Sequence, residues 1–484
     1  MSKSKLMGLH VDNGRIIRAA SKLGCLTFKA PFTYLGSTVG GSMSRIRAWD
    51  EVVNRVRLRL SKWKMTMLSI GGRLTLLKSV LGSTPIYHMS IHKTPLGVLR
   101  KLESLRSHFF NGCAPSCKKA SWVNWKHALA SKEKGGLEIA SLYALNRGLM
   151  FKWFWRFYTQ ESSLWSKVIK ALYGDSGSVD GDMNSGHTTC WKNIVKEVNL
   201  LVDKGIDLRN YICFKLGNGE KARFWEDRWS DGTPLKSRFP RVYALEMCKD
   251  ITVASKVSLH SFVSSFRRSP RGGVEHHQFE ELMSLVSDIR LVPMADRWSW
   301  NLSSSGDFSV SSVRRLIDDK TLPNDPLKTR WVRFVPIKIN VIAWKVKSNS
   351  LPSRFNISRR GIPLDSINCG ICDLGVETVS HLFFSCDLVR QLSILIARWW
   401  CVPYVGVESY AEWVAWLNSL RLPTKNKSML EGMFYIMWWY VWTFRNKMIF
   451  DSKSQRKSTL FDDIVSKSYF WIRHRCNSPF CMTD

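Results

Sequence analysis

Acidic residues are scarce in this chain of 484 residues, which has 39 Asp and Glu against 72 Lys and Arg and a formal net charge of +33. A folded domain does not need so large an excess for its solubility. The usual partners of such a surface are the phosphates of nucleic acids or the anionic face of a membrane. The excess is densest near the start, because residues 1–130 hold 22 basic and only 4 acidic side chains. The first quarter of the chain is therefore the part best suited to bind a polyanion.

Long apolar runs are also missing. The first six residues, Met1–Leu6, contain no apolar run, so we expect no signal peptide at this end. The most apolar stretch, Gly432–Phe444, lies between Glu431 and Arg445 and is shorter than the roughly 20 residues that span a membrane. We predict a buried helix there and no membrane partner.

Most of the 12 cysteines show no spacing typical of a disulfide framework. Scattered cysteines are typical of a reducing compartment, so we expect a nuclear or cytoplasmic protein that is not secreted. Three cysteines do cluster with a histidine within eighteen positions: Cys369, Cys372, His381 and Cys386. Two cysteines two residues apart can hold one ion from a tight turn, and the other two ligands can complete a tetrahedron. We predict a structural zinc ion, because four protein ligands leave no open position for water.

The spacing of apolar residues changes to a helical period from Arg45 onward. Trp49, Val52, Val56 and Leu60 recur at three- and four-residue steps and form one apolar face. Two more amphipathic helices are expected, one after Gly71-Gly72 and one through Leu99–Phe109. Together they predict a small bundle with basic outer faces, and the alternative interpretation of those charges is an ordinary solvated surface.

The middle of the chain predicts aromatic helices and two hairpins. Trp153, Trp155, Phe157 and Trp165 favour core packing over a stacking surface for nucleic acid. Gly217-Asn218-Gly219 predicts a hairpin that pairs residues 211–216 with 221–225. Residues 298–300 are expected to pair with residues 308–310 in a second hairpin.

Short motifs in a fixed order resemble the plant LINE-type (non-LTR) retrotransposon reverse transcriptases, in the part that follows the catalytic palm domain. The resemblance covers nearly the whole chain. The motifs that carry it are Lys3–Leu6, Tyr34–Gly36, Leu60–Trp63, Leu68–Arg73, Lys134–Leu137, Gly217–Gly219, Phe224–Asp227, Trp229, Trp298–Trp300, Gly306–Val310, Pro336–Lys338, Trp344 and the cluster Cys369–Cys386.

The resemblance implies roles for these segments. The motif Tyr34, Leu35 and Gly36 corresponds to the segment that helps hold the primer, and the helices of residues 45–115 correspond to the thumb, which closes on the template–primer duplex. A thumb contacts backbone phosphates without reading sequence. The contacts that we expect are Arg55, Arg59, Lys62, Arg73 and Lys78. For Arg73 the alternative is a structural residue that covers the Gly-Gly turn at the helix start.

The catalytic carboxylates of such a polymerase are not found in the expected order. They hold two metal ions, and in this family they precede the segment that resembles Lys3–Leu6. The two acidic pairs, Asp318-Asp319 and Asp462-Asp463, lie downstream and are interpreted as surface carboxylates. No ribonuclease H carboxylate set is evident. We therefore expect no catalytic residue in this chain.

The predicted fold class is α+β and mainly helical, with several domains: a thumb-like helical bundle, short β-hairpins and a small zinc module. The expected divisions are a palm remnant with the primer motif (1–44), the basic bundle (45–130), a connector of helices and hairpins (131–300), the zinc-binding domain (301–400) and a Trp-rich helical tail (401–484).

Three functions fit this pattern. The first is a C-terminal reverse-transcriptase fragment that binds zinc and RNA, RNA–DNA or DNA duplex but does not polymerise alone. The second is part of an active reverse transcriptase whose palm lies on another polypeptide or upstream in the same gene. The third is a zinc-stabilised scaffold for protein interactions.

Overall fold

The computed structural model describes residues 4–8, 11–29, 32–34, 37–39, 41, 43–62, 68–81, 85–113, 121–179, 189–230, 233–451 and 456–476. The chain divides into two compact units. The first comprises Met1–Ile86, Pro95–Leu142 and Thr321–Asp484, and the second comprises Tyr87–Thr94 and Tyr143–Lys320. The predicted mainly helical α+β class is confirmed, because helices dominate and the strands are short and paired two by two.

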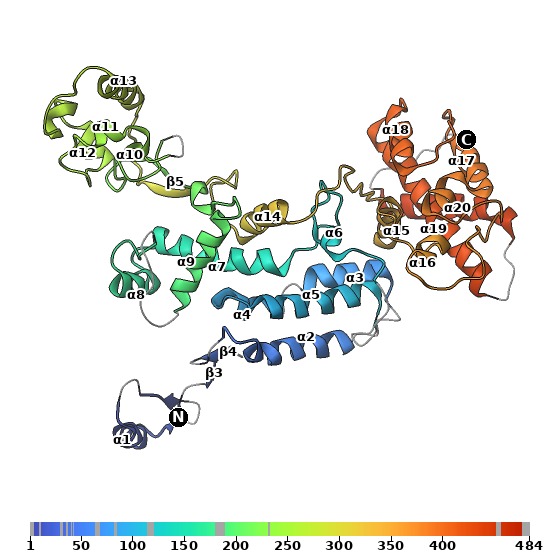
Figure 1. Ribbon diagram of the computed structural model, residues 1–484, viewed down its shortest axis with the longest axis horizontal. Helices are drawn as coiled ribbons and strands as arrows, with labels where there is room; N and C mark the ends of the chain where they lie inside the picture. Colours follow the sequence, from blue (N-terminus) through green and yellow to red (C-terminus); the bar gives the residue numbers. More distant parts are fainter. Residues whose placement is uncertain are drawn as a thin grey trace. The chain divides into compact units, whose positions relative to one another are not determined.

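The N-terminal part of the first unit carries small β-elements followed by helices (Figure 1). Its elements are β1 (Lys5–Leu6), α1 (Asn13–Leu23), β2 (Leu26–Thr27), β3 (Phe32–Tyr34), β4 (Ser37–Val39), the 3-10 helix η1 (Ile46–Trp49), α2 (Asp50–Lys62), α3 (Ile70–Leu76), the π-helical turn η2 (Leu77–Leu81), α5 (Leu96–Asn111) and α6 (Trp125–Leu129). β1 and β2 are parallel, and β3 and β4 form an antiparallel hairpin.

Helices α2, α3 and α5 form a bundle, which we call the basic bundle (Figure 1). The apolar face predicted for α2 is confirmed, since Val52, Val56 and Leu60 are buried together with Trp49 of η1. α3 begins at an N-cap in which Ser69 Oγ accepts a hydrogen bond from Gly72 N–H, and this satisfies one free helix-start donor. α5 ends at Gly112, whose φ of 72° closes the helix in the left-handed conformation that favours glycine.

The C-terminal part of the first unit is a second helical body. Its elements are α15 (Ile337–Lys347), α16 (Arg354–Ser358), the π-helical turn η5 (His381–Ser385), α17 (Asp387–Trp399), α18 (Tyr410–Ser419), α19 (Thr424–Phe450), the 3-10 helix η6 (Lys457–Thr459) and α20 (Leu460–Arg475). The buried helix predicted over Gly432–Phe444 is confirmed within α19, which packs on α15, α17 and α20. No helix of the described chain has the length and apolar character needed to cross a membrane.

One hydrophobic core fills this body, from Val332 to Ile472, with α19 running through its centre. Residues of the Cys369–Cys386 segment and Trp residues of the tail belong to the same core. The core therefore crosses residue 400, where the sequence placed a domain boundary. The five expected divisions remain a prediction.

Two motif glycines bring the basic bundle and α15 into close contact. A Cβ on Gly71 would lie 2.7 Å from the backbone nitrogen of Lys338, so only glycine permits this approach of α3 to the start of α15. The carbonyl of Gly135 accepts hydrogen bonds from Trp344 Nε1 at 2.8 Å and Lys347 Nζ at 3.3 Å. The motifs of the first 140 residues thus pack directly on those around residues 336–344.

The second unit contains two hydrophobic cores and one two-stranded sheet. Its elements are α4 (Ile86–Ile91), α7 (Leu142–Thr159), α8 (Leu164–Tyr173), α9 (Cys190–Val202), the 3-10 helix η3 (Leu208–Tyr211), β5 (Ile212–Lys215), α10 (Leu235–Arg238), α11 (Pro240–Tyr243), α12 (Val253–Val257), the 3-10 helix η4 (Phe262–Ser265), α13 (Val274–Ser287), β6 (Arg297–Trp300) and α14 (Val310–Thr321). The aromatic residues of α7 pack in the core, as predicted.

Both hairpins predicted for this unit are wrong. β5 pairs antiparallel with β6, so that Ile212 lies opposite Trp300 and Lys215 opposite Arg297. The turn at Gly217–Gly219 instead wraps around the carboxylate of Asp296, which accepts backbone N–H groups from Gly217, Gly219, Lys221 and Ala222. Burial alone would raise the pKa of Asp296, but these four donors together lower it below its usual value.

Candidate metal centre

The first two predicted ligands lie on a tight turn. Asn368 and Val376 form an isolated antiparallel bridge, and Cys369 N–H donates to the Gly375 carbonyl at 2.7 Å. Asp373 N–H donates to the Cys369 carbonyl at 2.9 Å, and its φ of 56° allows the chain to reverse. The turn therefore directs the Cys369 and Cys372 side chains to one side.

The other two ligands lie on the next helical segment. His381 begins η5, and Cys386 is the residue before α17, with its N–H donating to the His381 carbonyl at 2.7 Å. Leu382 and Phe384 of η5 are buried in the core, and they fix the orientation of His381 and Cys386.

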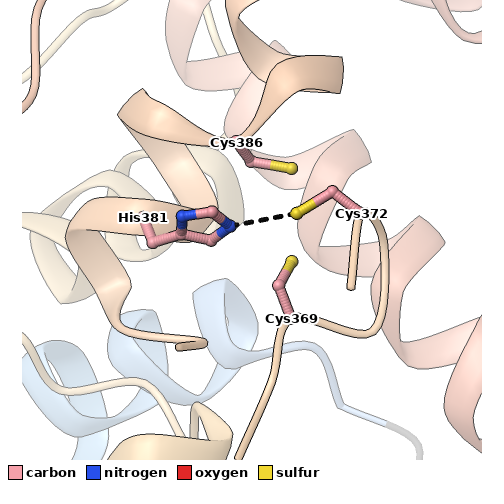
Figure 2. A group of neighbouring side chains, drawn as sticks. All are labelled: Cys369, Cys372, His381 and Cys386. Carbon is pink, nitrogen blue, oxygen red and sulfur yellow. Dashed lines mark hydrogen bonds between the residues drawn. The ribbon is translucent and has the colours of Figure 1, made fainter. Parts of the chain in front are cut away.

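The four side chains converge (Figure 2). Their ligand atoms all lie within 4.8 Å of one another, and Cys372 Sγ is 3.3 Å from His381 Nε2. In a tetrahedral zinc site with Zn–S bonds of about 2.3 Å the ligand atoms are about 3.8 Å apart. The Cys369 and Cys386 side chains are fully buried. Geometry, burial and donor types therefore fit one zinc ion with four protein ligands.

The thiols of the site interact with one another. A hydrogen bond with the Cys386 thiol is the main cause that lowers the pKa of Cys369 to about 5, and the same contact raises the pKa of Cys386. Backbone N–H groups of Ile371 and Cys372 also stabilise the Cys369 thiolate. A thiolate is the form of cysteine that binds zinc, so the turn prepares at least one ligand for a cation.

A buried ion pair that the sequence analysis missed supports the turn. The Glu377 carboxylate, fully buried, accepts Nη2 of Arg445 at 2.5 Å and Nε at 3.2 Å, and Arg445 belongs to α19. Glu377 also accepts the backbone N–H of Arg354 at 2.8 Å and of Gly370 at 3.4 Å. This pair connects the Cys-x-x-Cys turn to the central helix of the core.

The sequence carries only a weak signal for this pair. Arg445 directly follows the apolar stretch Gly432–Phe444, and a charge in a buried part of a helix has to find a buried partner. From the sequence alone, Arg445 only marks the end of that apolar stretch, with no indication that it is buried. Nothing in the sequence identifies Glu377, among the other acidic residues, as that partner.

The residues predicted to contact nucleic acid lie on the basic bundle or near it. Arg55 and Arg59 are exposed one helical turn apart on the same side of α2, and Arg57 is exposed on a different side. Arg55 pairs with Glu51 at 2.6 Å on this exposed surface. Lys78 is exposed on η2. The outer face of α2 is thus basic as predicted, while its binding role stays a prediction.

Arg73 lies differently from the others. It is half-buried, and its guanidinium donates to the carbonyls of Phe110 and Leu68, at 3.1 Å in each case. This geometry favours the structural alternative that the sequence left open. Tyr34 ends strand β3, Leu35 and Gly36 lie outside the described residues, and so do the side chains of Tyr34 and Lys62.

The two acidic pairs do not form a metal site with other residues of the described chain. Asp319, Asp462 and Asp463 are exposed, in agreement with the prediction. For Asp318 the prediction is wrong, because this residue is buried and forms an ion pair of 3.0 Å with Arg314 one helical turn earlier. Cys369, Cys372, His381 and Cys386 are the described residues that gather as a candidate metal-binding group.

Comparisons with known proteins agree with this geometry. Residues 308–392 match the family described as zinc-binding in reverse transcriptase, and all four ligands lie in this range. A protein of Arabidopsis thaliana named for ribonuclease H is 27% identical over 359 residues, which are 72% of this chain and 55% of that protein. An uncharacterized mitochondrial protein of Arabidopsis thaliana is 30% identical over 154 residues, 31% of this chain and 96% of the relative. The chain thus spans about half the length of the first relative.

Proposed function

Because the chain belongs to the plant retroelement family whose reverse transcriptases carry this zinc-binding domain, we propose that it is the thumb and zinc-binding region of a LINE-type RNA-directed DNA polymerase. In this proposal the basic bundle binds the backbone of an RNA–DNA or DNA duplex or of folded RNA. Cys369, Cys372, His381 and Cys386 hold one structural zinc ion. Such a region would act in the nucleus or the cytoplasm.

The observation that carries the proposal is the position of the basic face of α2. The apolar side of α2 is buried against α5, and Arg55 and Arg59, one helical turn apart, are exposed together on another side. Only Glu51 and Asp50, both in the first turn, are acidic on this helix. Regularly spaced arginines on a fixed helix can contact successive phosphates without reading bases.

Zinc in the proposed site would stabilise the fold and take no part in a reaction. Four protein ligands fill a tetrahedral ion, so the ion would crosslink the turn at Cys369 with the segment around Cys386. The Glu377–Arg445 pair would hold that crosslinked turn against α19. The basic bundle belongs to the same unit and contacts α15 through Gly71 of α3.

Polymerisation would need carboxylates that are not found in the expected order in this sequence. We propose that the chain alone binds but does not polymerise. An alternative is that a palm domain, supplied in cis or in trans, completes an active enzyme. The scaffold for protein interactions is the remaining alternative, and it predicts zinc binding without affinity for nucleic acid.

Binding of a fluorescent RNA–DNA heteroduplex at a series of salt concentrations tests the proposal. The triple variant Arg55→Gln, Arg59→Gln and Lys78→Gln should bind more weakly. The slope of the logarithm of its binding constant against the logarithm of the salt concentration, here called the salt slope, should fall in magnitude by roughly one per phosphate contact removed. Each phosphate contact releases counterions, so the slope counts the contacts.

A matched variant removes three exposed charges from the second unit instead: Lys167→Gln, Arg267→Gln and Arg315→Gln. It has the same net charge and should keep the parent's salt slope. Equal loss in both variants would mean that net charge alone attracts the duplex. No binding by the parent at low salt would favour the scaffold.

A further inference from the structure

The C-terminal half of α20 exposes aromatic and basic side chains together. The helix buries Ile464, Ser468 and Ile472 against the core. On the other side of the helix it exposes a set that we call the α20 surface. Its members are Lys467, Tyr469, Phe470, Arg473 and His474.

Two adjacent aromatic rings of α20 are exposed. Tyr469 is 40% exposed and Phe470 is 49% exposed, although α20 has a buried side in the core. Cations lie beside both rings: the guanidinium of Arg473 is 5.7 Å from the Tyr469 ring centre, and Lys467 Nζ is 5.6 Å from that of Phe470. The His474 ring lies 4.3 Å from that of Phe470.

The charged side chains of the α20 surface are all basic. From Ser466 to Arg475 the sequence contains no Asp or Glu, and the two acidic residues of the helix, Asp462 and Asp463, lie in its first turn. Arg473 Nη1 also donates to the Tyr469 hydroxyl at 3.1 Å, which holds the cation beside the ring. A partner that fits this surface offers both negative charge and flat apolar faces.

Single-stranded nucleic acid has both properties. We propose that the α20 surface binds a single strand of RNA or DNA, with unpaired bases stacked on Tyr469 and Phe470 and phosphates close to Lys467 and Arg473. Bases within a duplex are already stacked on one another, so exposed rings favour unpaired strands. An acidic protein surface would use the cations but offers few flat faces on which the rings could stack.

This surface goes beyond the duplex contacts proposed for the basic bundle, because it lies on a different helix and uses stacking. Both surfaces belong to the first unit. The two proposals can fail separately: loss of the α20 surface should spare duplex binding, and loss of the α2 charges should spare stacking.

Fluorescence anisotropy with labelled single strands of about 10 nucleotides tests the inference on the full chain. The variant Tyr469→Ala with Phe470→Ala should weaken single-strand binding on the order of 5- to 100-fold for each stacked base lost. Its affinity for the heteroduplex should change less than twofold. RNA and DNA strands of one sequence, compared in parallel, show which of the two is preferred.

Two further variants separate stacking from simple apolar contact. Phe470→Trp keeps an aromatic face and should retain binding, whereas Phe470→Leu keeps an apolar side chain and should lose it. Phe450→Ala removes another exposed ring, 77% exposed at the end of α19, and should leave binding unchanged. Because the replaced side chains are exposed, thermal unfolding should match that of the parent.

Several outcomes would overturn the inference. They are no binding of single strands by the parent, unchanged binding in the double alanine variant, full binding by Phe470→Leu, and equal loss for single strands and duplex. If sedimentation instead shows that the double variant loses self-association at unchanged nucleic-acid affinity, the α20 surface joins two copies of the chain.

Discussion

At the scale of single residues, the candidate metal centre depends on a charge pair buried in the core. Arg445 is 4% exposed and Glu377 is fully buried, and the carboxylate also holds the backbone of Gly370 between the two cysteines of the turn. Removing one partner of a buried pair leaves the other charged without compensation. The turn and the central helix α19 are therefore coupled through these two side chains.

We predict that Arg445→Met destabilises the first unit by about 3–5 kcal/mol, because the Glu377 carboxylate stays buried without its cation. The double variant Glu377→Gln with Arg445→Met should cost less than the single one. Urea unfolding followed by tryptophan fluorescence measures both.

The matched control is Arg390→Met in the neighbouring helix α17. Arg390 pairs with Glu408 at 3.5 Å, but the two side chains are 48% and 72% exposed, so this change should cost about 0–1 kcal/mol. A similar cost for Arg445→Met would show that the buried pair does not support the turn.

Residue identity was enough to predict the four candidate ligands, but not the ion pair of Glu377 and Arg445 that holds their turn in place. Cysteine and histidine at zinc-finger spacing indicate a site within eighteen positions of sequence. Glu377 and Arg445 are 68 positions apart, and their pairing follows from the packing of α19 on the turn. The same limit applies to Asp318, whose burial depends on how α14 packs.

At the scale of elements, helices were predicted well and strand pairing was not. The apolar face of α2 can be read from spacing, because its neighbours along the helix lie on one side. The pairing of β5 with β6 joins residues more than 80 positions apart, and the Gly217–Gly219 turn gave a local hairpin signal that Asp296 redirects. A turn motif does not reveal which carboxylate it will enclose.

The Gly71-Gly72 pair allows a test of how the basic bundle is joined to α15. A Cβ on Gly71 would lie 2.7 Å from the Lys338 backbone nitrogen, whereas one on Gly72 would first meet a Leu68 methyl group at 3.6 Å. We predict that Gly71→Ala lowers stability by about 1–3 kcal/mol, since two backbones have to separate.

Gly72→Ala is the control, in the same helix and one position away. It should be neutral or should stabilise the protein by up to about 1 kcal/mol, because alanine has the higher helix propensity. Calorimetric melting of the full chain compares the two variants. Equal melting temperatures would show that α3 does not need close contact with α15.

At the scale of the whole molecule, the sequence indicated the family, the helical class and the four candidate metal ligands, while the division into two units came only from the structure. The first unit combines Met1–Ile86, Pro95–Leu142 and Thr321–Asp484, and the two segments of the second unit, Tyr87–Thr94 and Tyr143–Lys320, interrupt it in sequence. Amino-acid composition does not reveal such a division, because both units contain amphipathic helices of ordinary composition.

We propose that one structural zinc ion holds the Cys369–Cys386 segment together. Metal analysis of the intact chain by mass spectrometry tests this proposal. The account predicts one zinc per chain, lost from Cys372→Ser and retained by Cys248→Ser, an exposed cysteine of the second unit. Zinc should also leave as the pH falls, because thiols and imidazole take up protons in place of the metal. A parent chain without zinc, or a Cys372→Ser variant that keeps one zinc per chain, would contradict the account.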